Sequence, residues 1–265
     1  ASGLGPEGRK FKSCCPDHLQ MFFKNIKKKP KLKILSGYNL RFRSVGTLSE
    51  KNIIKYAEKF KFDYEIKKPI FFERHFYWLK IKMIIENLEE NKHEYLFWLD
   101  ADTFFCRYEN ILDHINKSKH IFVVNQFFKS KNKSNFPNSN YLTWGPNVGV
   151  ILVRNTTWSL NFFRNVWNKK KYLNHFWPDN AAFLDELGFK SEITNIKDNK
   201  PKKSTLSKFQ FLPGTWNSMP KKNFDTPAID DISNFYFNPI IIHLAGIRRK
   251  DRLIFIKKYK HLFIK

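Results

Sequence analysis

The sequence predicts an α/β fold with a mainly parallel central sheet flanked by helices. Short apolar runs typical of buried strands alternate with amphipathic segments of helical period, and polar turns separate them. With 265 residues, of which 42% are hydrophobic and 17% aromatic, the chain can bury a substantial core. Intrinsic disorder, a collagen-like structure and a small disulfide-stapled scaffold are therefore excluded.

Each expected element follows from its local pattern. Strands are expected where apolar runs end in polar or glycine-containing turns, at Leu32–Leu35, Tyr95–Leu99, Ile121–Val124, Val148–Val153 and Ile240–Ile242. Helices are expected where apolar residues recur every three or four positions, at Ser49–Phe60, Glu73–Glu89, Thr157–Trp167 and Asn180–Leu187. Thr47 and Glu50 have the spacing of a capping box before the first helix. Polar stretches at 129–140 and 197–203 predict surface loops.

The chain is strongly basic, with 48 Lys or Arg against 24 Asp or Glu and a formal charge of +24. This charge suits a protein that binds nucleic acid or another polyanion, or one that contacts an anionic membrane. Lysine is abundant together with asparagine, phenylalanine and isoleucine, a bias that AT-rich coding produces without selection for binding. We therefore interpret much of the charge as compositional.

We expect one folded domain over residues 31–265, preceded by residues 1–30 as a basic leader or a cloning or stem remnant. No apolar run approaches the roughly 18 residues of a spanning helix, and the first residues lack the apolar core of a signal peptide. The three cysteines suggest no disulfide framework. Localisation stays open between the lumen of the Golgi or endomembranes, if an N-terminal anchor has been removed, and the cytoplasm.

Asp100 and Asp102 follow the aromatic strand Tyr95–Leu99 directly. Two carboxylates so close together repel each other and need a compensating cation, and hard oxygen ligands suit Mn²⁺ or Mg²⁺. The alternative is a polar turn that ends a strand. A third interpretation, the aspartyl-phosphate nucleophile of haloacid-dehalogenase-like phosphatases, fails because that motif carries Thr or Val where this chain has Phe104.

His243 ends the apolar run Ile240–Ile242 and is followed by a cluster of basic residues that includes Arg248 and Arg252. Its imidazole would complete a metal site with the two aspartates, and the basic cluster would hold phosphate oxygens. The alternative is a hydrogen-bonded core histidine followed by a solvated basic surface. The residues alone leave both interpretations open.

These pieces occur in one order along the chain: Trp78-Leu-Lys80, Phe97-Trp-Leu-Asp-Ala-Asp-Thr-Phe104, Asn147-Val-Gly149, Asp179-Asn180, Trp216-Asn217 and His243-Leu-Ala-Gly246. The ordered series resembles the GT-A glycosyltransferases. It is most similar to glycosyltransferase family 34, which contains galactosyl-, mannosyl- and xylosyltransferases. The retaining family that includes glycogenin shares the paired aspartates and the late histidine, so the fold is more firmly indicated than the family.

The resemblance implies a metal site of Asp100, Asp102 and His243 that holds Mn²⁺, or Mg²⁺, against the diphosphate of a nucleotide sugar, expected to be a UDP-sugar. It implies donor-binding roles for Gly37, Tyr38, Asn39, Lys80, Asp100, Ala101, Asp102, Asn147, Gly149 and Arg248. Asp179 and Asn180 match the catalytic segment near the reacting carbon, although Pro178 departs from the family's Asp at that position. Flat faces for sugar stacking would come from Trp144, Trp177 and Trp216, for which core or loop packing is an equal alternative.

The predicted function is that of a metal-dependent retaining glycosyltransferase. It would transfer galactose, xylose, glucose or mannose to a hydroxyl of a glycan, glycoprotein or glycolipid and form an α-linkage. One alternative is a basic protein that binds nucleic acid or polyanions, which is disfavoured because it leaves Asp100, Asp102 and His243 unexplained. Another is a catalytically inactive GT-A domain that binds sugar nucleotides, for which Pro178 is the only support.

Overall fold

The structure, a computed structural model, describes residues 31–129, 142–189, 201–220 and 238–265. The expected leader at residues 1–30 lies outside the described residues, as does most of each loop expected at 129–140 and 197–203. A six-stranded sheet has the order β2-β1-β3-β6-β5-β7, and a two-stranded sheet pairs β4 with β8. The strands are β1 (Leu32–Gly37), β2 (Asp63–Lys67), β3 (Tyr95–Leu99), β4 (Thr103–Phe105), β5 (Ile121–Lys129), β6 (Leu142–Arg154), β7 (Phe209–Phe211) and β8 (Ile241–His243).

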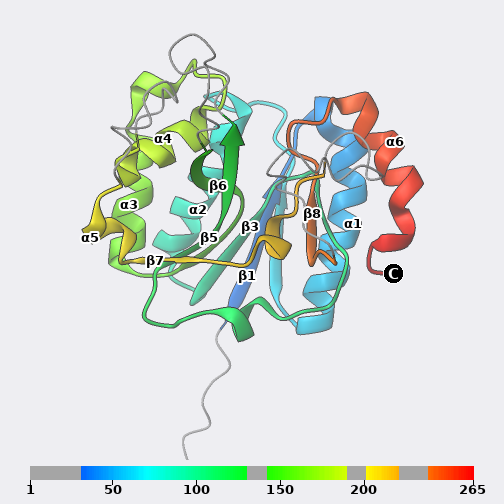
Figure 1. The fold of residues 1–265 in the computed structure, drawn as a ribbon, viewed down its shortest axis with the longest axis horizontal. Coiled ribbons are helices and arrows are strands. Elements are labelled where there is room, and N and C mark those ends of the chain that lie inside the picture. The colour runs from blue at the N-terminus through cyan, green and yellow to red at the C-terminus, as the bar shows by residue number, and fades with distance from the viewer. Residues whose placement is uncertain (1–30, 130–141, 190–200, 221–237) are drawn as a thin grey trace, which may run out of the picture.

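Helices cover both faces of the larger sheet (Figure 1). The α-helices are α1 (Arg43–Phe60), α2 (Leu79–Glu90), α3 (Thr157–Trp167), α4 (Pro178–Leu187), α5 (Lys203–Leu206) and α6 (Arg249–Tyr259). The 3-10 helices are η2 (Leu40–Phe42), η3 (Phe76–Trp78), η4 (Ile111–His114), η5 (Lys170–Tyr172), η7 (Gly214–Asn217) and η8 (Lys260–Leu262). In Figure 1, α2, α3 and α4 lie on one side of the sheet, whereas α1, α6 and β8 lie on the other.

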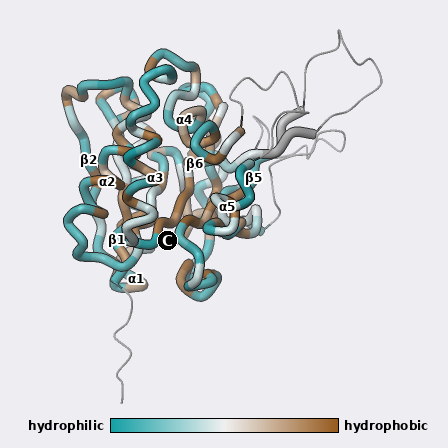
Figure 2. Tube along the Cα trace, turned by 90° about the vertical axis from the view of Figure 1, so that its left-hand side faces the viewer, coloured by the Kyte–Doolittle hydropathy of each residue, from teal (hydrophilic) through white to brown (hydrophobic). Residues whose placement is uncertain are grey.

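The core has two layers because the central strands are apolar on both faces. Every residue of β3 is buried, as expected for a strand covered by helices on both sides. One cluster packs α2, α3 and α4 against the sheet, and another packs α1 against the opposite face. In Figure 2 the hydrophobic colour gathers within the fold, including along β6, and the outer loops are mostly hydrophilic.

The predicted fold class is confirmed, and the strand pairs show which parts of the sheet are antiparallel. The pairs β1–β2, β1–β3 and β5–β7 are parallel, and β6 runs antiparallel to both β3 and β5. The expected strand Tyr95–Leu99 and helix Thr157–Trp167 have the predicted bounds. No helix among the described residues has the length and apolarity needed to cross a membrane.

Two helix starts differ from the predicted ones by six residues, and the helix expected from Asn180 begins two residues earlier, at Pro178. The first helix begins at Arg43 instead of Ser49, because η2, capped by the Asn39 side chain, leads directly into it. Glu50 therefore caps nothing and instead accepts hydrogen bonds from the Tyr38 hydroxyl and from Lys68. The second α-helix begins at Leu79 instead of Glu73, since η3 occupies the preceding turn.

The two strands next to the site, β5 and β6, are longer than their apolar runs predict. Their outer ends, at Asn125 to Lys129 and Leu142 to Asn147, mix polar and apolar residues and continue the antiparallel pairing. The edge strand β2 and the short strands β4 and β7 were not predicted. In β2 two apolar residues, Tyr64 and Ile66, alternate with charged ones over only five positions, and the burial pattern runs from exposed to half-buried, as expected at a sheet edge.

Candidate active site

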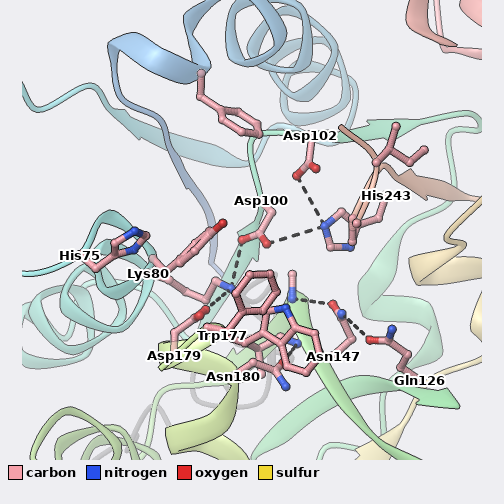
Figure 3. Close-up of a pocket in the computed structure, with 18 of the residues that line it drawn as sticks. His75, Lys80, Asp100, Asp102, Gln126, Asn147, Trp177, Asp179, Asn180 and His243 are labelled. Carbon is pink, nitrogen blue, oxygen red and sulfur yellow. Dashed lines mark hydrogen bonds and ion pairs between the residues drawn. The ribbon is translucent and has the colours of Figure 1, made fainter. Parts of the chain in front are cut away.

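Two carboxylates and an imidazole meet where β3 ends. Asp100 and Asp102 occupy the turn between β3 and β4, which closes through hydrogen bonds from the Thr103 amide and hydroxyl to the Asp100 carbonyl (3.0 and 2.8 Å). The β4–β8 ladder then pairs Thr103 with His243 and places the ring beside both carboxylates. His243 Nε2 lies 3.5 Å from Asp102 Oδ1 and 3.7 Å from Asp100 Oδ2 (Figure 3).

A bulge in β6 shapes the floor of the site. Val123 pairs with Ile151 and the next residue, Val124, pairs with Asn147, so residues 148–150 are left out of the β5–β6 ladder. The freed amide of Val148 donates to Asn180 Oδ1 (3.1 Å), and that of Gly149 donates to Asn147 Oδ1 (2.9 Å). The bulge thus joins α4 to β6 and orients Asn147, which the resemblance assigns to the donor site, and Asn180, which it assigns to the catalytic segment.

Gly149 has a steric role beside His243. A Cβ atom at this position would lie 2.1 Å from the ring carbon Cε1, so any other residue would displace the imidazole. Gly37 is also constrained, because a Cβ there would lie 2.6 Å from a methyl group of Leu79. Both glycines therefore permit close packing.

A buried lysine connects the paired aspartates to α4. Lys80 Nζ lies 2.8 Å from Asp179 Oδ2 and 3.1 Å from Asp100 Oδ1, and the Trp98 indole also donates to Asp100 Oδ1 (2.6 Å). The Lys80 side chain is 5% exposed, so its ammonium group depends on these carboxylates for compensation. Asp179 is held in the first turn of α4, where Pro178 at the first helical position needs no amide partner.

The electrostatics of the three groups differ. Burial alone would lower the pKa of Lys80, but Asp100 and Asp179 outweigh it and the pKa is raised. Burial raises the pKa of Asp100 despite the opposing effects of Lys80 and His243. Burial would also raise the pKa of Asp102, but the His243 ring, when protonated, and Arg252 lower it below its ordinary value. Of these two aspartates, Asp100 therefore has the less well compensated negative charge.

These residues line a cavity of about 680 Å³, within the usual size of a small-molecule site. The charged groups among the described lining residues are three carboxylates and two cations, namely Asp100, Asp102, Asp179, Lys80 and Arg252. With its histidines neutral, the lining carries a formal charge of −1. One negative charge of the cavity lining is therefore left uncompensated.

The donor set of Asp100, Asp102 and His243 fits a divalent cation. One ligand atom from each lies within 4.8 Å of the others. An ion with bonds of about 2.1 Å needs neighbouring ligand atoms about 3–4 Å apart, so a small adjustment would suffice. Two carboxylates and one imidazole suit Mn²⁺ or Mg²⁺, and the remaining coordination positions would be open to substrate oxygens.

Arg252, one of the basic residues after His243, is directed toward the site. Its Nε lies 3.2 Å from Asp102 Oδ2, and its guanidinium packs over Phe42. Arg248, to which the sequence assigned the diphosphate, instead pairs with Asp251 at the start of α6 and has a side chain that is 65% exposed. It is not among the described residues that line the cavity.

The remaining predicted residues divide into two groups. Asn147, Asn180 and Trp177 line the cavity, and Trp177 is 46% exposed. Five others are not among the described lining residues, namely Gly37, Tyr38, Asn39, Ala101 and Trp216. Trp216 is fully buried and packs edge-on against Phe97, so for it the core interpretation is correct. The side chain of Trp144 lies outside the described part of the structure.

Several residues at the site were not predicted from the sequence. His75 and Tyr77 line the cavity from the turn before α2, and His175 lines it from the segment before α4, but no motif marks these residues. Gln126 lies on the part of β5 that the apolar run did not predict, and its Oε1 accepts a hydrogen bond from Asn147 Nδ2 (2.8 Å). Asn217 was noted only as part of a motif, yet its Oδ1 lies 2.9 Å from His243 Nδ1.

Comparisons with known proteins identify the family and the fold of the chain. The sequence profile of the nucleotide-diphospho-sugar transferase family matches residues 51–254. Comparison with curated protein sequences gives no match. Among solved structures, a glycosyltransferase involved in glycosylation of the major capsid of PBCV-1 is similar, with a TM-score of 0.54, 13% identity, and coverage of 86% of this chain and 100% of that one.

Two further structures have the same fold. The bifunctional glycosyltransferase WbbM gives a TM-score of 0.53 at 13% identity, over 86% of this chain and 50% of that one. The galactosyltransferase LgtC, solved with donor and acceptor sugar analogues, gives 0.50 at 10% identity, over 87% of this chain and 94% of that one. Since the family profile matches more than half of the sequence, the chain belongs to the nucleotide-diphospho-sugar transferase family and has the GT-A glycosyltransferase fold.

Proposed function

We propose that this protein is a metal-dependent retaining glycosyltransferase that uses a nucleoside-diphosphate sugar, with UDP as the expected nucleotide. The observation that carries the proposal is the charge of the cavity. Three carboxylates face two cations in a cavity large enough for a small molecule, and two of the carboxylates converge with His243. A divalent cation would change the formal charge from −1 to +1, which favours a diphosphate.

Asp100, Asp102 and His243 would hold Mn²⁺ or Mg²⁺. Such an ion, when bound, neutralises the diphosphate as it leaves the sugar. Arg252 lines the cavity beside Asp102, so we assign the contact with the diphosphate to Arg252 and keep Arg248 as the alternative. Because a guanidinium offers a fork of donors, Arg252 can bond a phosphate oxygen while its Nε stays near Asp102.

Asp179 is the candidate for stabilising the positive charge that develops on the sugar. Its carboxylate lines the cavity and is held 2.8 Å from the Lys80 ammonium. Asn180 is tied to the β6 bulge and fixes the first turn of α4 against the cavity floor. The domain proposed over residues 31–265 would thus be catalytic, with α4 presenting the catalytic segment to the bound sugar.

Retention, the α-linkage and membership of family 34 follow from the resemblance and belong to this proposal. The donor sugar would be galactose, xylose, glucose or mannose. The acceptor would be a hydroxyl of a glycan, glycoprotein or glycolipid, with the exposed indole of Trp177 as a stacking face. Contact with an anionic membrane remains a secondary proposal, motivated by the charge of +24.

The test is a thermal-shift screen of UDP, GDP and their sugars, with and without Mn²⁺. A ligand that binds only the native state at 100 times its Kd stabilises it by about 2.7 kcal/mol. We expect a shift with a uridine nucleotide that requires Mn²⁺, disappears in Asp102→Ala and persists in the control Asp63→Ala, whose side chain is exposed on β2. Transfer or hydrolysis of the donor then distinguishes an enzyme from an inactive nucleotide-binding domain.

Absence of a shift with every nucleotide in a folded sample would contradict the proposal. Salt-sensitive binding of DNA that is unchanged by Asp102→Ala would then favour the polyanion-binding alternative.

A further inference from the structure

A chain of hydrogen bonds lies behind His243, on the side away from the two aspartates. The Gly149 amide donates to Asn147 Oδ1 (2.9 Å), and Asn217 Nδ2 donates to the same oxygen (3.1 Å). Asn217 Oδ1 then lies 2.9 Å from His243 Nδ1. Asn217 is fully buried in η7, so water does not compete with these bonds. Figure 3 shows Asn147 beneath the imidazole, with Gln126 beyond it.

The direction of every bond in this chain follows from its first donor. A backbone N–H can only donate, so the oxygen of Asn147 must face Gly149. That oxygen can only accept, so Asn217 must present its NH₂ group to Asn147. The other end of the Asn217 amide, its oxygen, then faces His243 and requires a proton on Nδ1. The assignment of both amides is thus fixed by the β6 bulge, which frees the Gly149 amide.

A proton on Nδ1 leaves Nε2 of the neutral ring as a lone pair. Nε2 is the atom that faces Asp102 Oδ1 at 3.5 Å and Asp100 Oδ2 at 3.7 Å. Those carboxylates are acceptors, and by themselves they would favour the opposite tautomer, with a proton on Nε2. That tautomer could not bind a cation through Nε2.

We infer that Asn217, oriented by Asn147, sets the tautomer of His243 and keeps Nε2 available to a divalent cation. Asn217 is thus a positioning residue that acts through His243. Hydrogen bonds behind metal-binding histidines commonly contribute 10–100-fold to metal affinity. The inference rests on the proposed metal site, but the tautomer of the ring can be measured without any metal.

The experiment is nitrogen-15 NMR of the histidine ring in the metal-free full chain, at a pH high enough for the ring to be neutral. We expect His243 to carry its proton on Nδ1 in the wild type. In Asn217→Leu we expect the proton to move largely to Nε2, and the affinity for Mn²⁺, measured by calorimetry, to fall 10–100-fold. A wild-type ring protonated on Nε2 would overturn the inference, as would an unchanged tautomer in folded Asn217→Leu.

Two variants at Asn147 distinguish the orientation of the Asn217 amide from the effect of packing at Asn147. Asn147→Asp keeps an oxygen that accepts from Gly149 and from Asn217, so the Nδ1–H tautomer should persist. Asn147→Leu removes that oxygen and should release the Asn217 amide to rotate, giving a mixture of tautomers. Equal tautomer populations in the two variants would contradict the inference, even if both lose stability.

Asn52→Leu is the control for loss of a buried asparagine. Asn52 lies on α1, is 6% exposed and makes two hydrogen bonds to the backbone of Phe105 in β4. Its replacement should lower thermal stability without changing the His243 tautomer. Binding of Mn²⁺ by the wild type tests the proposed function separately. If the His243 ring is protonated on Nδ1 but the wild type binds no Mn²⁺, the positioning role of Asn217 stands and the proposed metal site is refuted.

Discussion

The cavity has two charged corners that differ in how their charges are balanced. In the lysine corner, Lys80 contacts Asp179 and Asp100 at 2.8 and 3.1 Å. In the histidine corner, Asp100 Oδ2 and Asp102 Oδ1 both face His243 Nε2, which the Asn217 contact leaves without a proton in the neutral ring. In the first corner a buried lysine bridges the two carboxylates, whereas in the second three acceptor atoms face one another and Arg252 contacts only the other oxygen of Asp102.

This difference separates a structural role from a binding role. A buried ion pair that loses its cation is strongly destabilised, because a charge is left without compensation. A group of converging acceptors costs stability in the free protein and regains it when a cation binds. Substitutions in the lysine corner should therefore lower stability, while charge-removing substitutions in the histidine corner should lower metal affinity.

The largest effect is expected for Lys80→Met, which retains much of the side-chain volume and removes the cation. Asp100 and Asp179 would be left unpaired in the cavity wall, and the free energy of unfolding should fall by about 3–5 kcal/mol. Urea denaturation followed by tryptophan fluorescence measures this loss.

Lys82→Met on the same helix is the matched control. Its side chain is 40% exposed and its ion pair with Glu73 is long, at 3.9 Å, so we expect a change within about 0.5 kcal/mol. The double variant Lys80→Met with Asp179→Asn should recover part of the stability, because one of the unpaired charges is removed. Equal losses in the Lys80 and Lys82 variants would refute the division into two corners.

In contrast to Lys80→Met, Asp100→Asn should lower metal affinity and leave the stability of the free protein intact. The amide oxygen can still accept from Trp98 and Lys80, while the formal charge of the cavity lining rises from −1 to zero. Stability of the free protein should stay the same or increase, and the affinity for Mn²⁺ should fall about 100-fold, equal to about 2.7 kcal/mol. Calorimetry with Mn²⁺ and thermal denaturation without it measure the two effects. A large loss of stability without metal would show that the contact of Asp100 with Lys80 dominates, and would contradict a binding role for Asp100.

The sequence predicted the histidine corner better than its surroundings, for physical reasons. Asp100 and Asp102 follow an apolar strand in which every residue is buried, so local patterning places them at a sheet edge. His243 follows another apolar run, and both its residue type and the resemblance suggested that it joins the two aspartates, whereas its pairing with Thr103 was not predicted. The predicted ligand set coincides with the cluster in the structure, whereas metal binding itself stays a prediction.

Other features depend on contacts between distant segments and have no local signal. The bulge in β6 requires the pairing with β5, and the sequence gives only an apolar run that begins at Val148. Arg248 and Arg252 are four positions apart in one basic cluster, so composition could not decide which one faces the cavity. That choice depends on the ion pairs with Asp251 and Asp102.

Arg252→Lys tests this assignment, and its expected effect is smaller than those above. The substitution keeps the positive charge beside Asp102 but removes the fork of donors, so nucleotide affinity in the presence of Mn²⁺ should fall about 10-fold. Arg248→Lys is the matched control and should change the affinity less than about 2-fold, because its side chain is 65% exposed and pairs with Asp251. Calorimetric titration with UDP measures both. A larger loss in Arg248→Lys would restore the assignment made from the sequence.

The smallest effect is expected at Glu65 on β2, where an ion pair lies away from both corners. Burial would raise the pKa of Glu65, but Lys33 and Lys67 outweigh it and hold the pKa below its ordinary value. The folded protein therefore binds this proton less readily than the unfolded chain does. The resulting stability is present above the ordinary glutamate pKa of about 4.3 and is lost as the pH falls through the lower value of the folded state.

Glu65→Gln should accordingly lower the free energy of unfolding at neutral pH by no more than about 1 kcal/mol, since the site is partly exposed. The difference from the wild type should shrink as the pH falls below about 4. Urea midpoints at neutral and acid pH measure this, and a difference that persists at low pH would mean that packing, not charge, is responsible. The stabilisation by Mn²⁺ should be the same in both proteins, because Glu65 is not among the described residues that line the cavity.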